Sequence, residues 1–216
     1  MSAVTAPAQP GRSALTAVLL SLGLGGFGIG VGEFVPMGLL PEIAGTYDTS
    51  ISQAGHVVSA YALGVVVGAP VLATFGARFP RRALLIALML AFAAGNLLSA
   101  LAPTYPALVG ARFLAGVPHG AFFGVAALVA ATAAGPRRRA WAVSRVMLGL
   151  SVATVVGVPA ATWLGQAIGW RSAFLLVAAI ALLTALSMSV RSAPRRRCAA
   201  PTCAPSSARC GVRWCG

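Results

Sequence analysis

The chain lacks most of the residue types on which soluble enzymes depend. Its 216 residues include no lysine, three acidic residues and two histidines. So few general acids and bases, with no Ser-His-Asp or metal-ligand spacing among them, exclude an enzyme, and no cofactor or metal is predicted. The GxGxxG-like strings near residues 23–28 follow no strand, so they do not indicate a nucleotide site. Charged residues make up only 9% of the chain, against about 25% in soluble domains, which excludes an ordinary soluble fold.

The basic residues are all arginine, and the formal net charge is +13. In a soluble protein such a charge would suggest a nucleic-acid partner. Here the arginines stand in short clusters between long apolar runs, with no basic helix face and no aromatic platform. We therefore interpret the charge as a signal of membrane topology and predict no nucleic-acid binding.

Hydrophobic residues make up 58% of the chain, and they gather in six long runs. Each run is close to the roughly 20 residues that cross the hydrocarbon core of a bilayer. A secretory signal peptide is the alternative for the first run, but that run lacks a small-residue cleavage site and five more runs follow, so we predict a retained helix. The sequence thus predicts an all-α integral membrane protein with helices over 14–35, 53–75, 83–102, 107–131, 146–166 and 172–190.

Arginine clusters lie in every second connection between these predicted helices. The clusters are Arg78, Arg81 and Arg82, then Arg137, Arg138 and Arg139, and finally Arg191, Arg195, Arg196 and Arg197. The opposite connections carry Glu42 and Asp48, then no charge, then Arg171 alone. The positive-inside rule therefore predicts a multi-pass protein of the cell (inner) membrane with both termini in the cytoplasm.

Glycine and proline content falls along the first three predicted helices and falls again along the last three. The first and fourth helices are rich in both, the second and fifth intermediate, and the third and sixth poor. Small residues permit close helix contact, and prolines are tolerated where neighbours or a cavity satisfy the freed carbonyl. The order predicts a 3+3 inverted repeat of the kind that transporters have. A chance order among glycine-rich membrane helices is the alternative.

Four stretches carry a resemblance to a known family. They are "GEFVPMGLLPEIA" (32–44), "GARFPRRALL" (76–85), "RFLAGVPHGAFFGVAALVAA" (112–131) and "GLSVATVVGVPAATWLGQAIGWRSAF" (149–174). The chain resembles the major facilitator superfamily, in its drug–proton antiporter and arabinose (sugar) efflux branch. The third stretch, which looks like the fourth helix of that branch, is the most specific match. The resemblance covers about residues 15–190, the six-helix N-terminal half of a twelve-helix fold.

The resemblance implies a transporter that exports small drug- or sugar-like molecules against proton entry, by rocking two halves around a central site. The partners it implies are the lipid bilayer, the substrate and protons. The chain departs from the family at a loop motif, where Ala77 stands at the position of an acidic residue. The basic residues Arg78, Arg81 and Arg82 remain, and we interpret them as a cytoplasmic gating loop that also attracts anionic lipid headgroups.

Glu33 is an acid within the first apolar run. A carboxylate inside a membrane is costly and marks a functional site by default. The resemblance implies that Glu33 accepts a proton when substrate leaves. The alternative is a hydrated carboxylate at the membrane interface.

The predicted fourth helix carries Arg112 and His119 on one face, because residues seven apart point nearly the same way. Gly116, Gly120 and Gly124 follow Arg112 at intervals of four, which makes one smooth column. We predict that this face lies inside the bundle and lines the substrate and proton pathway. For Arg112 the alternative is snorkelling to the headgroups. For His119 we favour a hydrogen bond to a neighbouring helix over titration in a mechanism.

The fifth predicted helix supplies three further candidates for the helix-packing and cavity face, namely Gly149, Gly157 and Pro159. His56 is interpreted as structural, because it stands early in the second helix. The remaining polar residues of the helices give no distinctive signal, and they are Tyr61, Asn96 and Gln166.

The chain changes character after Val190, where arginine, proline and cysteine dominate and no apolar helix follows. All the cysteines lie there, at Cys198, Cys203, Cys210 and Cys215. We therefore divide the chain into a cytoplasmic tail (1–13), a six-helix transporter half (14–191) and an aberrant tail (192–216) from out-of-frame or truncated translation. A zinc site is the alternative for that tail, but its C-x4-C spacings lack the usual C-x2-C pairs. A reducing cytoplasm disfavours disulfides there.

Two classes of function remain. The first is one half of a proton-coupled exporter, which needs a second half to complete its site. The second is a membrane protein that does not transport alone, either an inactive fragment or a six-helix subunit that works only as a dimer of two copies.

Overall fold

The computed structural model describes residues 12–76 and 78–190, and those residues are helical with no strand among them. The α-helices are α1 (Arg12–Gly38), α2 (Leu40–Tyr47), α3 (Ile51–Ala54), α4 (His56–Gly76), α5 (Arg81–Leu101), α6 (Tyr105–Ala134), α7 (Arg139–Val152), α8 (Val158–Ile168) and α9 (Trp170–Val190). A 3-10 turn, η1 (Pro136–Arg138), precedes α7, and a π-helical segment, η2 (Ala153–Gly157), joins α7 to α8.

Six stretches of the described chain are long and apolar enough to cross a membrane. They are Ser13–Gly38, Ile51–Leu72, Arg81–Leu101, Tyr105–Ala134, Pro136–Ile168 and Trp170–Val190. The prediction of an all-α integral membrane protein with six spans is thus confirmed.

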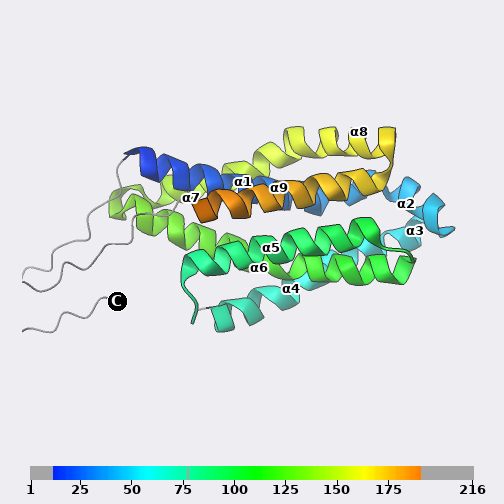
Figure 1. Ribbon diagram of the computed structural model, residues 1–216, viewed down its shortest axis with the longest axis horizontal. Helices are drawn as coiled ribbons and strands as arrows, with labels where there is room; N and C mark the ends of the chain where they lie inside the picture. Colours follow the sequence, from blue (N-terminus) through cyan, green and yellow to red (C-terminus); the bar gives the residue numbers. More distant parts are fainter. Residues whose placement is uncertain (1–11, 77, 191–216) are drawn as a thin grey trace, which may run out of the picture.

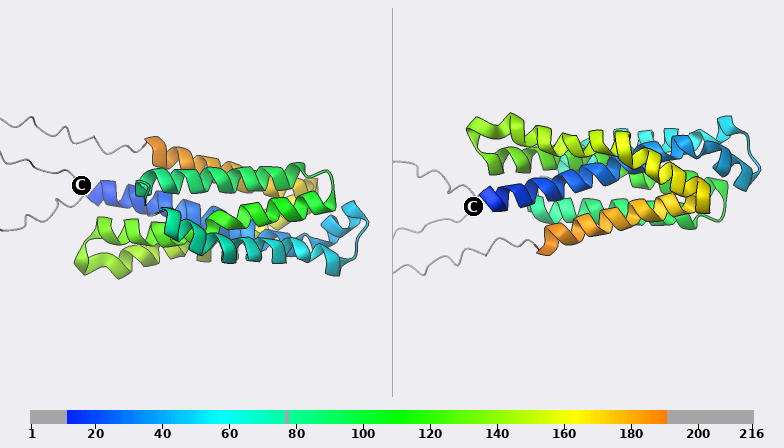
Figure 2. Two further views of the ribbon diagram at one scale, coloured as in Figure 1. Left: turned by 90° about the horizontal axis from the view of Figure 1, so that it is seen from below. Right: turned by 90° about the horizontal axis from the view of Figure 1, so that it is seen from above.

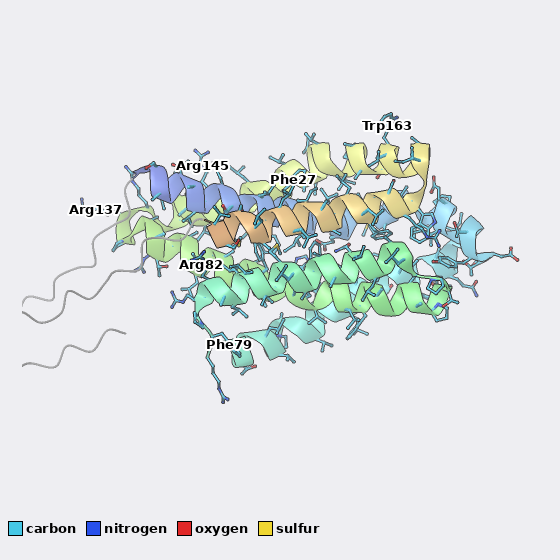
Figure 3. All side chains as sticks on the ribbon, viewed as in Figure 1. Phe27, Phe79, Arg82, Arg137, Arg145 and Trp163 are labelled. Atoms are coloured by element: carbon cyan, nitrogen blue, oxygen red, sulfur yellow. The ribbon has the colours of Figure 1, made fainter. Side chains whose placement is uncertain are left out.

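The long helices run side by side along the long axis of the molecule (Figure 1; Figure 2 shows the same bundle from two further sides). One end, which we call the arginine end, holds Arg78, Arg81, Arg82, Arg137 and Arg138. The short helices α2 and α3 lie at the other end, which we call the opposite end. Large apolar side chains point outward between the two ends, among them Trp163, which is 70% exposed (Figure 3).

In two pairs of helices a glycine of one helix lies directly against a backbone carbonyl oxygen of the other. In the α4–α6 pair, a Cβ atom added at Gly64 would lie 2.1 Å from the carbonyl oxygen of Phe113. In the α1–α7 pair, a Cβ atom at Gly149 would lie 2.0 Å from the carbonyl oxygen of Gly23. In a 3+3 repeat the first span corresponds to the fourth and the second to the fifth. The pair of the second and fourth spans (α4 and α6) therefore corresponds to the pair of the fifth and first spans (α7 and α1). The predicted 3+3 repeat therefore has a direct counterpart in the packing.

The fifth span differs from its predicted range of 146–166, because it begins with Pro136 and places Arg139 and Arg145 on a helix. The apolar run alone marked the predicted start, but arginine is a good helix former and its long stem covers apolar surface. The guanidinium of Arg145 lies 5.2 Å from the centre of the Trp141 ring, which is such a contact. The π-helical segment η2 leads into Pro159, which has no N–H to continue the α-helical hydrogen bonds.

A cluster of aromatic residues closes the opposite end. The hydroxyl of Tyr47 donates to the carbonyl of Ala102 at 2.9 Å, and the indole of Trp170 donates to the hydroxyl of Thr46 at 2.8 Å. Arg171 donates to the same Ala102 carbonyl at 3.2 Å. Burial raises the pKa of the Tyr47 phenol, against the opposing charge of Arg171, so the hydroxyl keeps the proton that it donates. These bonds tie α2 to the α5–α6 connection and to the start of α9.

Candidate substrate and proton site

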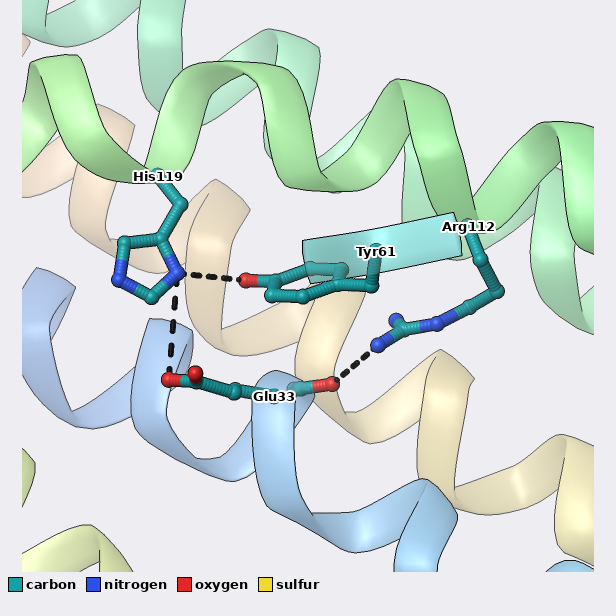
Figure 4. A network of polar contacts seen from close by, with 5 residues as sticks. Glu33, Tyr61, Arg112 and His119 are labelled. Atoms are coloured by element: carbon teal, nitrogen blue, oxygen red, sulfur yellow. Dashed lines mark hydrogen bonds and ion pairs between the residues drawn. The ribbon is translucent and has the colours of Figure 1, made fainter. Parts of the chain in front are cut away.

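Side chains from three helices converge on a polar cluster within the apolar bundle (Figure 4). Glu33 comes from α1, Tyr61 from α4, and Arg112 and His119 from α6. The three candidates chosen from sequence, Glu33, Arg112 and His119, therefore lie together, and Tyr61 stands between Arg112 and His119. We call these four residues the polar cluster.

Arg112 lies at the buried end of the polar cluster, with none of its surface exposed. Its Nη2 donates to the carbonyl of Gly32 at 2.9 Å, and Nη1 lies 3.5 Å from Oδ1 of Asn96, which is at the limit of a hydrogen bond. The guanidinium also stacks 4.3 Å from the centre of the Tyr61 ring. Arg112 thus lies inside the bundle and is held against the peptide bond that precedes Glu33, rather than reaching the headgroups.

The charge of Arg112 has no close counterion within the described part of the chain. No described carboxylate lies within 4.0 Å of its guanidinium, and its Nε makes no hydrogen bond there. A buried cation is costly unless other groups compensate it. The ring of Tyr61 and the Gly32 carbonyl supply part of that compensation, and a carboxylate at Glu33 adds the only nearby negative charge.

One nitrogen of His119 faces two possible partners. Its Nδ1 lies 3.0 Å from the hydroxyl oxygen of Tyr61 and 3.9 Å from Oε2 of Glu33. In the neutral imidazole this nitrogen can accept a hydrogen bond from the Tyr61 hydroxyl. In the charged ring it carries a proton and donates a hydrogen bond instead. Nδ1 therefore bonds Tyr61 in one protonation state and can pair with the Glu33 carboxylate in the other.

Exposure increases along the polar cluster from Arg112 to Glu33. Arg112 is fully buried and Tyr61 is 2% exposed, whereas the side chains of His119 and Glu33 are 13% and 29% exposed. A proton or a polar ligand can thus reach Glu33 from a surface of the bundle. Arg112 lies deeper, behind the other members of the cluster.

Two members of this site gave no signal in the sequence, namely Tyr61 and Asn96. Tyr61 shares a face of α4 with Gly64 and Gly68, because residues three and seven apart lie on one side of a helix. Both glycines pack against the backbone of α6. The position of Tyr61 three residues before Gly64, on the same helix face as the GxxxG pair, could therefore have predicted that its side chain faces the fourth span.

The glycine column of α6 divides into two parts. A Cβ atom at Gly116 would lie 2.2 Å from the carbonyl oxygen of Tyr61, and one at Gly120 would lie 2.7 Å from the Cβ of Ala69. Both glycines thus permit the contact with α4 that places the Tyr61 ring beside Arg112. Gly124 is exposed, and a Cβ atom there would meet no described atom within 4 Å.

The candidates of the fifth span pack against α1 rather than joining the polar cluster. Gly149 contacts the backbone of Gly23, and a Cβ atom at Gly157 would lie 2.5 Å from a methyl group of Val31. Pro159 is exposed at the start of α8.

The predicted gating arginines lie at the arginine end. Arg78 is in the α4–α5 connection, and Arg81 and Arg82 are in the first turn of α5. Arg82 reaches across to the end of α9, where its Nε and Nη2 donate to the carbonyl of Met188 at 3.0 and 2.8 Å. A cation at the last carbonyls of a helix stabilises its C-terminus, so Arg82 joins the start of α5 to the end of α9 (Figure 3).

The described residues contain no group of three or more His, Cys, Asp or Glu side chains that could hold a metal ion. The cysteine-rich segment 192–216, with its predicted aberrant origin and its zinc alternative, lies outside the described residues. So do residues 1–11 of the predicted N-terminal tail (1–13).

A polar cluster within six membrane-crossing helices, arranged as an inverted repeat, defines the class of membrane transporters. The sequence matches the Major Facilitator Superfamily over residues 22–208, and the chain belongs to that family. The resemblance seen in the sequence is thus confirmed.

The chain is similar to several proteins about twice its length, two of which are named for transport. It is 49% identical over 170 residues to the inner membrane transport protein YdhP of Escherichia coli, covering 79% of this chain and 44% of the relative. It is 36% identical to a chloramphenicol resistance protein of Streptomyces lividans (82% and 45% covered). It is 31% identical to a probable sugar efflux transporter of Pasteurella multocida (82% and 44% covered).

The fold is also that of a solved transporter. The proton:xylose symporter XylE superimposes with a TM-score of 0.74 at 19% identity, covering 82% of this chain and 45% of that one. The match shows the fold alone. The chain thus spans about half the length of the relatives it matches.

Proposed function

We propose that this chain is the N-terminal half of a proton-coupled exporter of small drug- or sugar-like molecules. The polar cluster carries the proposal, because it places an accessible carboxylate beside a histidine and a buried cation within a membrane. Relatives named for chloramphenicol resistance and sugar efflux support these two substrate classes.

In this proposal Glu33 is the proton acceptor. When Glu33 is ionised it balances the charge of Arg112, and it can pair with a protonated His119 through Nδ1. When Glu33 takes up a proton that balance is lost, and Nδ1 of His119 returns to the hydroxyl of Tyr61. Substrate and proton would then alternate at the surface that Glu33 and His119 share.

A second six-helix half would supply the other wall of the site. Transport would follow from rocking of the two halves around the polar cluster, with alternating access to the two sides of the membrane. The chain would lie in the inner membrane with its arginine end toward the cytoplasm, as the positive-inside rule requires.

Reconstitution into vesicles tests this proposal, with chloramphenicol and a simple sugar as probes. We expect no uphill transport from the 216-residue chain alone. Co-expression with the C-terminal half of a relative such as YdhP should restore transport that depends on the proton gradient. If the chain alone drives uphill efflux as a monomer, the need for a second half is disproved.

Infrared spectroscopy of the purified chain tests the role of Glu33 without a substrate. The protonated carboxylic acids of Glu33, Glu42 and Asp48 all absorb in the same region, and one component that titrates with pH should be lost in Glu33→Gln. Glu42→Gln, which removes an acid at the opposite end, is the matched control and should keep that component. A pH-difference spectrum that is the same in Glu33→Gln as in the unmodified chain would remove Glu33 from the mechanism.

A second candidate is a six-helix subunit that works as a dimer of two copies. A groove of about 590 Å³ between α1 and α7, lined by Leu20, Leu24 and Leu148 among others, favours it as a surface that another bundle could cover. In the same vesicle assay this candidate predicts transport by the chain alone, with cross-linking that traps two copies. An inactive fragment predicts transport in neither arrangement.

A further inference from the structure

An apolar groove of about 500 Å³ opens between α4, α5 and α6 at the arginine end. Its walls include Leu72 of α4, Leu84 of α5 and Leu128 of α6, and Arg81 is the one charged residue in its lining. The groove lies apart from the polar cluster, none of whose residues line it. The groove therefore lies at the level of the membrane leaflet on the side of the arginine end.

Gly120 and Gly124 also line the groove. Gly120 is explained by its contact with Ala69 of α4. Gly124 is not, because it is exposed and a Cβ atom there would meet none of the described atoms within 4 Å. Contact between helices does not require this glycine, so the space above it is free for a molecule that is not part of the described chain.

Charge is unbalanced at the same place. Arg78 and Arg81 are exposed, and Arg81 makes no hydrogen bond or ion pair with any described residue. The acidic residues lie elsewhere, Glu33 in the polar cluster and Glu42 and Asp48 at the opposite end. The mouth of the groove is therefore positive, while its floor and walls are apolar.

We propose that this groove binds an anionic phospholipid, with one acyl chain over Gly124 and the phosphate at Arg81. The guanidinium matches a phosphate in geometry and charge. The acyl chain packs in the groove, but every lipid tail is equally apolar, so this packing does not select one lipid over another. The preference for an anionic lipid over a neutral one comes from the headgroup charge. Basic pockets between membrane helices recognise anionic headgroups in this way.

Native mass spectrometry of the purified 216-residue chain in detergent tests the charge requirement. Phosphatidylglycerol and phosphatidylcholine with identical acyl chains are the probes. We expect tighter binding of phosphatidylglycerol, and Arg81→Gln should weaken it by about fivefold. Arg138→Gln removes one arginine from the same end and is the matched control, so it should leave binding nearly unchanged.

A second pair of variants tests the groove itself. Gly124→Leu should fill the groove and reduce phosphatidylglycerol binding several-fold. Gly110→Leu is its control, because Gly110 is also exposed on α6 and its added Cβ atom also meets nothing within 4 Å. The Cβ atom of either variant meets no described atom within 4 Å, and circular dichroism of both purified variants checks that they fold.

Three outcomes would overturn the proposal. The first is equal binding of the two lipids, and the second is equal loss in Arg81→Gln and Arg138→Gln, which would mean diffuse attraction. The third is a dimer of the chain whose formation Gly124→Leu abolishes, which would mean that a second copy covers the groove. None of these measurements depends on transport.

Discussion

At the scale of single residues, Tyr61 connects the buried cation to the exposed acid. Its ring lies against Arg112 and its hydroxyl reaches Nδ1 of His119, which also faces Glu33. Two partners for one nitrogen mean that the Tyr61 bond and the Glu33 pair compete. Tyr61, which gave no distinctive signal in the sequence, is thus one of the two partners between which His119 alternates.

Tyr61→Phe separates the two roles of this tyrosine. The ring stays under Arg112, while the hydrogen bond to His119 is lost, so the free energy of unfolding should fall by only about 0.6 kcal/mol. We expect the ring nitrogen signals of His119 to shift in the NMR spectrum of a chain labelled in its two histidines, with those of His56 unmoved.

Tyr105→Phe is the matched control, because the hydroxyl of Tyr105 donates to the Gln53 carbonyl at the opposite end of the molecule. It should leave both histidine signals in place. Unchanged His119 signals in Tyr61→Phe would show that the Tyr61 bond does not set the state of that ring.

Residue type predicted three members of this site, and the structure added Tyr61 and Asn96. Glu33, Arg112 and His119 could be predicted because charged and titratable side chains are costly in a membrane and stand out there. Tyr61 and Asn96 are common in membrane helices, so only their distance from Arg112 distinguishes them. That distance depends on how close α4 and α5 approach α6, which the sequence of one helix does not specify.

At the scale of helices, glycine permits the closest backbone contacts of two pairs. The α4–α6 and α1–α7 contacts each place a carbonyl oxygen where a Cβ atom would stand. Gly64→Ala and Gly149→Ala should therefore each force their pair apart and lower the free energy of unfolding by about 1–3 kcal/mol. Because the repeat exchanges the two pairs, their losses should be similar.

Unfolding of the purified chain in mixed micelles, followed by helical circular dichroism, measures these losses. Gly110→Ala adds the same methyl group to α6 where nothing lies within 4 Å, so it should cost almost nothing. A loss in Gly110→Ala as large as in Gly64→Ala would mean that glycine flexibility, rather than close contact, governs stability.

Hydropathy alone predicted the positions of the membrane spans, but not where every helix ends. Five predicted spans lie within the observed ones to a few residues, because an apolar run must be helical to satisfy its backbone in lipid. The fifth span extends well ahead of 146, through Arg139 and Arg145, since a helix continues past the hydrocarbon wherever side chains and caps support it. Apolar length therefore predicts the crossing but not the helix ends.

At the scale of the whole molecule, the distribution of charge should orient the bundle. Arginines gather at one end, and the opposite end holds Glu42, Asp48 and the single cation Arg171. Moving the arginine end across the membrane would carry several fixed charges through hydrocarbon, which insertion disfavours. We therefore expect one orientation, with the arginine end in the cytoplasm.

The position of the cysteines makes this orientation measurable in the unmodified chain. All of them follow residue 190, beyond the last span, so a thiol reagent reports on one side of the membrane only. A maleimide that does not cross membranes should leave intact cells unlabelled and should label inside-out vesicles. Asp48→Cys, in a variant whose four native cysteines are serine, should give the reverse pattern, because residue 48 lies at the opposite end. Labelling of the native cysteines in intact cells would place the arginine end outside.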